Sequence, residues 1–405
     1  MEQAVKAAPA RGYRWVILGV LWLTFVIIYS QRLSLGPLAP FLKAELNMTS
    51  TQIGLVMSAI AVGFMTSQFP VGWLVDRIGA RWPMAIGELI AGSAMIVLFF
   101  IPSYASLLGL MFVAGLGCGF LMPATTQGVI VWFPPKERAT VMGLKQTSTN
   151  VGGIFSAAFL PTIALALGWR YGFLVLGVIA IATGLVVLAL YREPVKINET
   201  ASAGHSKGAS ALDVLKNRQI WLVALAGTCL AWVEFTVMAH LTLYLTEALF
   251  LPIVAAGGIL AMVQFAGAMA RPGAGLLSDR AFNGRRKPVF MLMAGVTCAI
   301  CLTIGLLGPT LSWGIYPVLF LLGFGGTSFG GVFLTLISEL AGRQAVGKAV
   351  GMSSTIANLG FFFGPVIFGS LVDRSGSYQI AWLSLALMAG LCLCLLLFVR
   401  EKKEI

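Results

Sequence analysis

The sequence predicts an all-α membrane protein whose twelve transmembrane helices form two pseudo-symmetric six-helix bundles. Of its 405 residues, 58% are hydrophobic and only 10% are charged. A soluble domain has about 25% charged residues, so this composition excludes an ordinary soluble protein. The apolar residues come in runs of about 20, the length of helix that crosses a bilayer core. The basic residues gather between alternate runs, and a pattern of residues in the first half recurs in the second half.

The apolar runs define the spans and the division of the chain. Each span should be a helix, because an open strand cannot satisfy its backbone hydrogen bonds in lipid. The first run is too long for a signal peptide, so we interpret it as an uncleaved span. One long polar stretch gives an N-terminal bundle at 1–190, a cytoplasmic central loop at 191–218 and a C-terminal bundle at 219–405. The spans are expected at 15–35, 52–74, 82–101, 106–131, 138–165, 170–190, 219–246, 253–276, 287–307, 313–339, 346–371 and 379–399.

The net charge of +12 indicates an orientation. In a soluble protein it would favour nucleic acid, but here the basic residues flank membrane spans, where cytoplasmic loops collect Lys and Arg. A cytoplasmic N-terminus leaves the outer loops with only Lys43, Arg170 and Arg374. We therefore expect a monomeric multi-pass protein of a bacterial inner membrane with both termini cytoplasmic. The cytoplasmic basic residues are then Lys6, Arg11, Arg14, Arg77, Arg81, Lys136, Arg138, Arg192, Lys196, Lys207, Lys216, Arg218, Arg280, Arg285, Arg286, Lys287, Arg343, Lys348, Arg400, Lys402 and Lys403.

Two blocks of residues recur between the halves at nearly constant spacing. Such a duplication predicts two parallel six-helix units that rock about a site between them. No residue cluster predicts a metal or another cofactor, since the cysteines are scattered within apolar runs. The first-half residues are Gly72, Asp76, Arg77, Gly143, Thr147, Asn150 and Gly152, and their counterparts are Gly275, Asp279, Arg280, Gly351, Thr355, Asn358 and Gly360.

The segment Gly72-Trp-Leu-Val-Asp76-Arg77-Ile-Gly79-Ala-Arg81 resembles the G-x-x-x-D-R-x-G-x-R loop of the major facilitator superfamily. It lies between the second and third spans, where that family carries it, and its second copy lies between the eighth and ninth. The resemblance implies the major facilitator fold. Physically, Gly72 allows two helix ends to approach, Asp76 suits the positive N-terminus of a facing helix, and the arginines can pair with acids. We predict a gating role for Gly72, Asp76, Arg77, Arg81, Asp279 and Arg280.

Three cations are expected inside spans, where an ionisable residue costs a few kcal/mol or more and usually faces a cavity or a partner. Arg32 lies about 25 Å along its helix from Trp15, too deep to reach cytoplasmic water. It either lines a cavity or extends toward the outer interface. Lys145 either faces the cavity or has a structural partner, for example Glu88. Arg271 likewise either binds an anion or has a structural partner.

Two shorter segments resemble particular branches of the family. Tyr29-Ser30-Gln31-Arg32 resembles the first-helix Y-x-D-R pattern of anion:cation symporters, and Arg271-Pro272 resembles the eighth-helix Arg-Pro of monocarboxylate transporters. Both resemblances imply an arginine on the path of an anionic substrate. Guanidinium geometry suits a carboxylate, which it can hold by two parallel hydrogen bonds.

The acidic residues of those branches are absent here. Gln31, Cys118 and Gly267 stand at positions where the resemblance would place a carboxylate, and Met111 stands at the position of a fourth-helix arginine. Glu234 is the remaining candidate for proton coupling, because a buried carboxyl group can hold a proton near neutral pH. The alternative is a paired, structural acid.

These residues predict a secondary transporter of small organic anions, such as monocarboxylates or sugar acids, that works by alternating access. A drug or metabolite efflux antiporter on the same fold is the first alternative. An intramembrane enzyme is a remote one: Gly326-Thr-Ser328-Phe-Gly330 reads G-x-S-x-G, but that motif needs a strand-to-helix turn. We therefore expect no enzyme activity. The predicted partners are the bilayer, an anion and a coupling proton, and the predicted substrate-binding residues are Arg32, Lys145, Arg271, Gln31, Tyr29, Gln127, Asn150, Gln264 and Asn358.

Overall fold

The computed structural model describes residues 12–100, 103–193, 216–310, 314–341 and 345–401, and these residues contain helices and no strands. Within them, 12 helices are long and apolar enough to cross a membrane, as the sequence predicts. The N-terminal bundle consists of α1 (Tyr13–Arg32), α2 (Leu35–Glu45), α3 (Ser50–Ile78), α4 (Arg81–Phe100), α5 (Tyr104–Trp132), α6 (Pro135–Leu167) and α7 (Trp169–Leu190). The C-terminal bundle consists of α9 (Arg218–Glu247), α10 (Ile253–Ala281), α11 (Arg286–Leu307), a 3-10 turn (Gly308–Thr310), α12 (Ile315–Gly326), α13 (Gly330–Ala341), α14 (Val346–Ser375) and α15 (Tyr378–Leu397).

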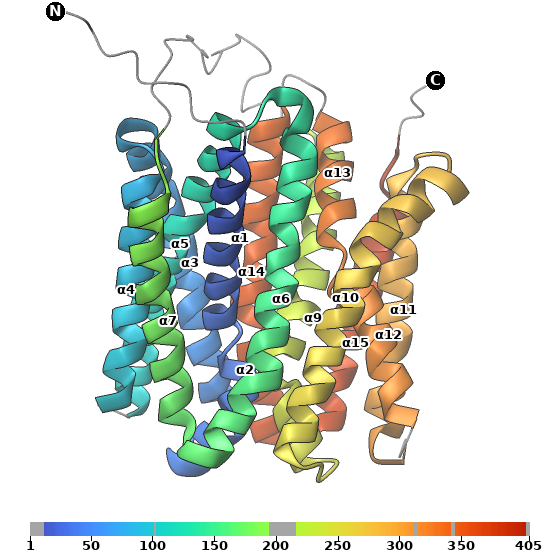
Figure 1. Ribbon diagram of the computed structural model, residues 1–405. Helices are drawn as coiled ribbons and strands as arrows, with labels where there is room; N and C mark the ends of the chain where they lie inside the picture. The colour runs from blue at the N-terminus through green and yellow to red at the C-terminus, as the bar shows by residue number, and fades with distance from the viewer. Residues whose placement is uncertain (1–11, 101–102, 194–215, 311–313, 342–344, 402–405) are drawn as a thin grey trace, which may run out of the picture.

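The helices run between two faces of the molecule (Figure 1). The start of α1 and the end of α15 lie at the face that is uppermost in Figure 1, called the upper face below. The end of α2 and the start of α3 lie at the opposite, lower face. Most of the predicted central loop, at 194–215, lies outside the described residues, as do Lys6, Arg11, Lys196, Lys207, Arg343, Lys402 and Lys403.

Two of the predicted spans are interrupted helices. The first was expected to end at 35, but α1 ends at Arg32 and the chain continues through α2 to Glu45. The hydroxyl of Ser34 donates to the Gln31 carbonyl at 2.7 Å and so satisfies a carbonyl group at this break. The tenth span breaks between α12 and α13, where Thr327 follows a pair of glycines. Each break frees backbone polar groups near the middle of the molecule.

Matching glycines bring the first helix of each half against a partner helix. A Cβ at Gly152 of α6 would meet the carbonyl oxygen of Val26 and, at 2.9 Å, the amide nitrogen of Ser30 in α1. A Cβ at Gly360 of α14 would meet α9 in the same way, with the Trp232 amide nitrogen at 2.7 Å. The same close approach therefore occurs at corresponding positions in the two halves. In the N-terminal half, it fixes the part of α1 that leads to Arg32.

The two halves meet closely at the lower face. The Ser58 hydroxyl in α3 donates to the Phe362 carbonyl in α14 at 2.6 Å. Lys43 at the end of α2 pairs with Glu247 at the end of α9, with 2.8 Å between nitrogen and oxygen. At the upper end of α3, by contrast, Gly72 has nothing within 4 Å of an added Cβ. The structure is therefore a conformation in which the lower side is closed.

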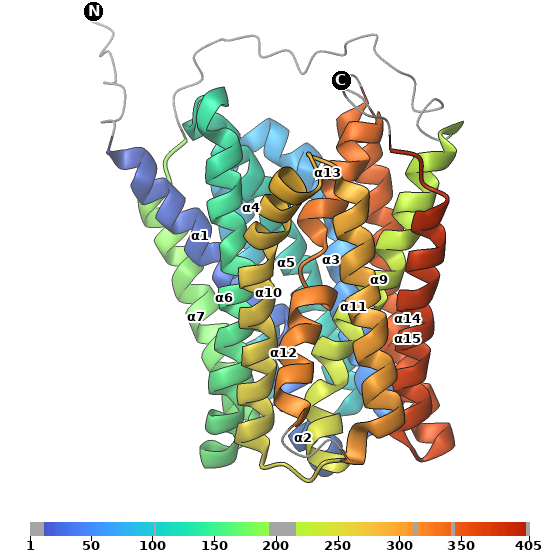
Figure 2. The same cartoon turned by 90° about the vertical axis from the view of Figure 1, so that its right-hand side faces the viewer.

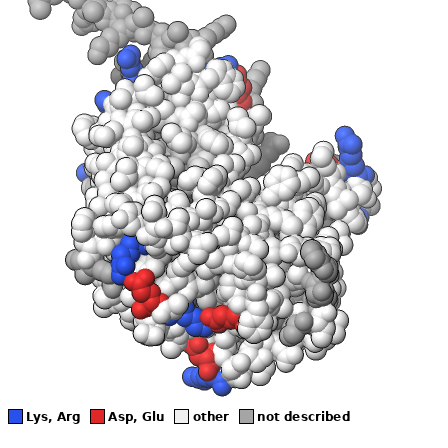
Figure 3. Space-filling view, turned by 60° about the horizontal axis from the view of Figure 1, so that its bottom comes forward, with Lys and Arg blue, Asp and Glu red and all other residues white. Residues whose placement is uncertain are grey.

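Charged side chains on the lower face lie in neighbouring pairs of opposite sign (Figure 3). Arg170 at the start of α7 pairs with Glu45 at the end of α2, and Lys43 pairs with Glu247. The first pair lies within one half, whereas the second joins the halves. The basic residues expected in the outer loops therefore have acidic neighbours here, apart from Arg374, for which no ion pair is formed among the described residues.

Candidate functional site

Arg32 ends α1 deep inside the molecule. Its side chain is only 3% exposed, and the guanidinium carbon lies 3.9 Å from the ring centroid of Phe64, 5.2 Å from that of Tyr29 and 5.7 Å from that of Phe235. Within the described residues, its Nε has no hydrogen-bond partner, and none of the ion pairs includes it. The cation is thus held by aromatic faces and lacks a fixed anionic partner, so it does not extend to the outer interface.

Lys145 is also buried, at 1% exposure. Its ammonium group donates to the hydroxyls of Thr125 at 3.2 Å and Thr126 at 3.4 Å, both in α5, and lies 4.3 Å from the ring centroid of Phe25. Pairing with Glu88, one of the two expected alternatives, does not occur: both Glu88 oxygens are buried without a hydrogen-bond partner. Glu88 lies on the side of α4 that packs against Gly184 of α7, which is why the two charges do not meet.

Arg271 in α10 reaches across to the other half of the molecule. It is half-buried, and it donates to the Thr149 hydroxyl of α6 at 2.8 Å and to the Thr327 carbonyl at 3.4 Å. That carbonyl is available because the helix breaks between α12 and α13. Thr149 lies one turn after Lys145 on α6, so Lys145 and Arg271 approach the same stretch of that helix.

Glu234 in α9 is an acidic residue that lies within electrostatic range of two of the buried cations. Its carboxylate interacts electrostatically with Arg271 and, more weakly, with Arg32. It forms no ion pair within 4 Å among the described residues. The structure therefore brings Arg32 from the N-terminal half together with Arg271 and Glu234 from the C-terminal half. An anion bound here would compete with Glu234 for the arginines.

The neutral residues predicted to bind substrate are spread more widely. Tyr29 lies against Arg32, and Gln31 accepts a hydrogen bond from the Cys118 thiol at 3.5 Å. The Gln264 amide packs against Gly153 of α6, between the halves. Asn150 is buried in α6, and Asn358 is half-buried in α14. None of these last three residues has a hydrogen bond that ties it to a cation of the site.

Gln127 lies apart from this group. It lines a cavity of about 300 Å³ between α3 and α5, together with Gln68, Gly72, Asp76 and Thr126. Because Thr126 also accepts from Lys145, the cavity extends from the predicted gating loop toward that lysine. Thr126 thus links the lining of this cavity to the buried cation.

The residues of the predicted gating loop make no ion pair between the halves among the described residues. Arg77 lies over the Trp73 ring at 3.5 Å, and Arg81 donates to the Leu188 carbonyl, so within the part of the chain that the structure describes neither makes the expected pair with an acid. In the second copy, Asp279 pairs with Arg286 at 2.7 Å within its own half, and Arg280 is exposed. Glu193 instead caps the start of α4 by accepting from Ala80 and Arg81 amides.

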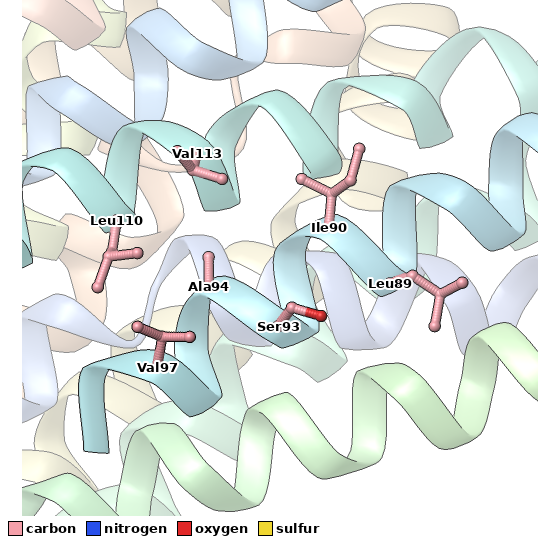
Figure 4. Close-up of a pocket in the computed structure, with 7 residues that line it drawn as sticks. All are labelled: Leu89, Ile90, Ser93, Ala94, Val97, Leu110 and Val113. Carbon is pink, nitrogen blue, oxygen red and sulfur yellow. The ribbon is translucent and has the colours of Figure 1, made fainter. Parts of the chain in front are cut away.

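A cavity of about 440 Å³ between α4 and α5 has no part in this chemistry (Figure 4). It is a shallow groove between α4 and α5 whose lining is apolar apart from Ser93, and it holds no charged residue. Its position on the outside of the bundle suits contact with lipid chains. The residues that line it are Leu89, Ile90, Ser93, Ala94, Val97, Leu110 and Val113.

Sequence reasoning did not identify the partners of the buried cations. Thr125, Thr126, Thr149 and Phe64 sit in apolar helices without any distinctive spacing, and a threonine in such a helix usually bonds to its own backbone. Two adjacent threonines at the level of an intramembrane lysine were one available signal. Phe235 could have been suspected because it follows Glu234 directly.

Comparison with known proteins identifies a family and several transporters to which the chain is similar. A family model described as Major Facilitator Superfamily matches residues 21–365 and 318–405. A probable sulfoacetate transporter of Cupriavidus necator is 27% identical over 99% of this chain and 95% of its own length. A hexuronate transporter of Bacillus subtilis is 25% identical over 94% and 93%, and a probable galactarate/D-glucarate transporter of the same species is 24% identical over 92% and 89%.

Among solved structures, the chain is similar to a bacterial homologue of the human lysosomal transporter Spinster. For the structure described as inward-facing and occupied, the TM-score is 0.79 at 15% identity, and the match covers 96% of this chain and 97% of that one. The unoccupied structure gives a TM-score of 0.77 at 16% identity. At this level of identity the likeness concerns the arrangement of the helices.

Proposed function

Because the chain belongs to the major facilitator superfamily, we propose that it is a secondary transporter that moves small organic anions by alternating access. The substrates are carboxylates or similar acids. Three relatives are described as transporters of sulfoacetate, of hexuronate and of galactarate or D-glucarate, which supports this class of substrate. The substrate would bind between the halves, where Arg32 and Arg271 approach Glu234.

A single observation carries the proposal: three cations lie inside the membrane-spanning region without an ion-pair partner among the described residues. Arg32 and Lys145 come from the N-terminal half and Arg271 from the C-terminal half. A charge at this depth costs a few kcal/mol or more. Such a cost is sustained most readily where a negatively charged substrate binds the cations in each transport cycle.

Glu234 is the proposed coupling residue. A proton on its carboxyl group would free Arg271 and Arg32 for the substrate, and loss of that proton would favour substrate release. This mechanism couples an anion to a proton without the first-helix carboxylate that Gln31 replaces. It makes the proton and the anion move together across the bilayer.

We also propose a location, an oligomeric state and the absence of catalysis. The proposed location is a bacterial inner membrane, with the upper face in the cytoplasm, because the basic residues at that face match the distribution typical of cytoplasmic loops. The proposed unit is a monomer without enzyme activity. The Ser328 hydroxyl, in the break after α12, donates to the Phe324 carbonyl of that helix and not to a general base.

Uptake into proteoliposomes tests the function. Labelled mono- and dicarboxylates and a sulfonated acid would be offered with and without an inward proton gradient. We expect uptake of at least one acid, lost in Arg32→Ala and retained in Arg400→Ala, which removes an exposed cation far from the site. The loss should be at least about tenfold, since a hydrogen bond to a charged group contributes about 1.5–3 kcal/mol.

Two results would contradict the proposal. One is an Arg32→Ala variant that folds normally and still transports acids at the wild-type rate. The other is no uptake of any acid together with extrusion of cationic dyes, which would establish an efflux antiporter on the same fold instead.

A further inference from the structure

The predicted gating motif occurs once more, at the end of α14. The segment 369–376 reads Gly-Ser-Leu-Val-Asp-Arg-Ser-Gly, and 72–79 reads Gly-Trp-Leu-Val-Asp-Arg-Ile-Gly. The local structures also agree: Gly79 (φ 84°) and Gly376 (φ 63°) follow their helices and donate at 2.9 Å to the carbonyls of Val75 and Val372. However, α3 ends at the upper face and α14 ends at the lower face (Figure 1).

The lower-face copy is engaged with the other half of the molecule. The Asp373 carboxylate accepts from the backbone amides of Ser50 at 2.8 Å and Thr51 at 2.7 Å, and from the Thr51 hydroxyl at 2.6 Å. The first amides of a helix have no partner within the helix, and its N-terminus carries a partial positive charge. Asp373 therefore caps α3 from across the interface between the halves.

The surrounding contacts reinforce this junction. Gly369 lies one turn before Asp373, and a Cβ there would meet Ser50 backbone atoms, with the Thr51 amide nitrogen at 2.7 Å. Lys43 donates to the Ser50 hydroxyl at 3.1 Å and pairs with Glu247. Together these residues join the lower ends of α2 and α3 to those of α9 and α14.

The upper-face copy makes no such contact in this conformation. Asp76 is exposed and accepts no hydrogen bond from the described residues, and Gly72 has open space around it. Because α3 and α14 pack against each other and run in opposite directions, the end of α3 lies on the same side as the start of α14. The N-cap residue of α14, Ala345, supplies no side-chain cap to that helix.

We infer that Asp373 is the gating residue of the lower face: its contact with the start of α3 holds the lower side closed, and breaking that contact shifts the protein toward the state that is open there. The antiparallel pair of α3 and α14 thus carries this latch at its lower end. This inference depends on the fold and not on the identity of the substrate.

Thiol labelling in lipid nanodiscs tests this inference without any transport measurement. One reporter is Ser58→Cys, which is buried between the halves below the site; the other is Gln68→Cys, which lines the upper cavity. Each reporter is made in a background that carries Cys298→Ser and Cys394→Ser, because these two native thiols are not fully buried. Labelling rates with a polar maleimide are compared in three backgrounds: Asp373 intact, Asp373→Asn and Arg374→Gln, the last being a control in the same motif.

We expect Asp373→Asn to raise labelling at Ser58→Cys by about tenfold, as the loss of a charged hydrogen-bond acceptor implies, and to lower labelling at Gln68→Cys. Arg374→Gln should change neither rate. The reciprocal change distinguishes a shift between two states from a loss of stability, which would raise both rates. Equal rates in all backgrounds, or a parallel rise at both reporters, would overturn the inference.

Discussion

Arg32 illustrates at the scale of one residue why the site requires an anion. Three aromatic rings surround its guanidinium. A cation–π contact contributes about 0.5–2 kcal/mol, whereas removing an ion from water costs several kcal/mol even after the protein relaxes. The rings therefore offset only part of the penalty. In the proposed mechanism, an incoming carboxylate would supply the remaining stabilisation, and its departure would restore the unfavourable empty state.

Replacing Glu234 by Gln should uncouple transport from protons. The amide keeps the size of the side chain but cannot bind or release a proton. We expect counterflow exchange of the substrate across proteoliposomes to continue, while stimulation of uptake by an inward proton gradient is lost. Glu137→Gln serves as the control, because Glu137 pairs with Arg14 within the N-terminal half and has no part in the site or in the junction between the halves. Gradient-driven accumulation that survives in Glu234→Gln would exclude Glu234 as the coupling residue.

The sequence could predict the buried cations but not their neighbours. Arg32, Lys145 and Arg271 stand out because a charge within an apolar run is costly. Their surroundings depend on how each helix is rotated about its axis, which a nearly uniform apolar sequence does not specify. The possible pairing of Lys145 with Glu88 fails for this reason, since Glu88 faces Gly184.

At the scale of the helices, glycine decides which helix surfaces come close. Gly152 and Gly143 both lie in α6, but an added Cβ would meet the α1 backbone at Gly152 and nothing within 4 Å at Gly143. We expect Gly152→Ala to lower the thermal unfolding midpoint in detergent, with a cost of about 1–3 kcal/mol. Gly143→Ala should have no effect or stabilise by up to about 1 kcal/mol.

The two substitutions have the same chemistry in the same helix, so their comparison isolates the contact with α1. If Gly152→Ala unfolded at the same temperature as Gly143→Ala, the close packing of α1 and α6 would not contribute to stability as described here. Transport by Gly152→Ala should also fall, because the shifted part of α1 leads directly to Arg32.

The span positions were predictable from hydrophobicity, whereas the helix breaks were not. Apolar length is set by the bilayer, and it is read directly from the residues. The breaks after Arg32 and after Gly326 change neither hydropathy nor charge, so the sequence predicted continuous helices. The break after Gly326 lies in the Gly-rich segment that resembled an enzyme motif, and it provides the Thr327 carbonyl for Arg271.

At the scale of the whole molecule, the repeated blocks predicted two equivalent six-helix units. Gly152 and Gly360 occupy corresponding positions and pack against corresponding helices, α1 and α9. The conformation itself was not predictable, because one sequence encodes every state of the cycle. The motif at 369–376 was visible in the sequence, but only the contact of Asp373 with α3 reveals which end of the pair is closed.

If transport requires the lower side to open, then a covalent link across that face should stop it. The double variant Lys43→Cys, Glu247→Cys places two thiols where an ion pair joins the halves. It is made in a background that carries Cys298→Ser and Cys394→Ser. We expect a short bifunctional thiosulfonate to reduce substrate exchange in proteoliposomes to background, and a reducing agent to restore it. Each single variant should keep its activity after the same treatment. Full exchange by the linked protein would mean that the substrate crosses without separation of the halves at this face, which would exclude alternating access about the central site.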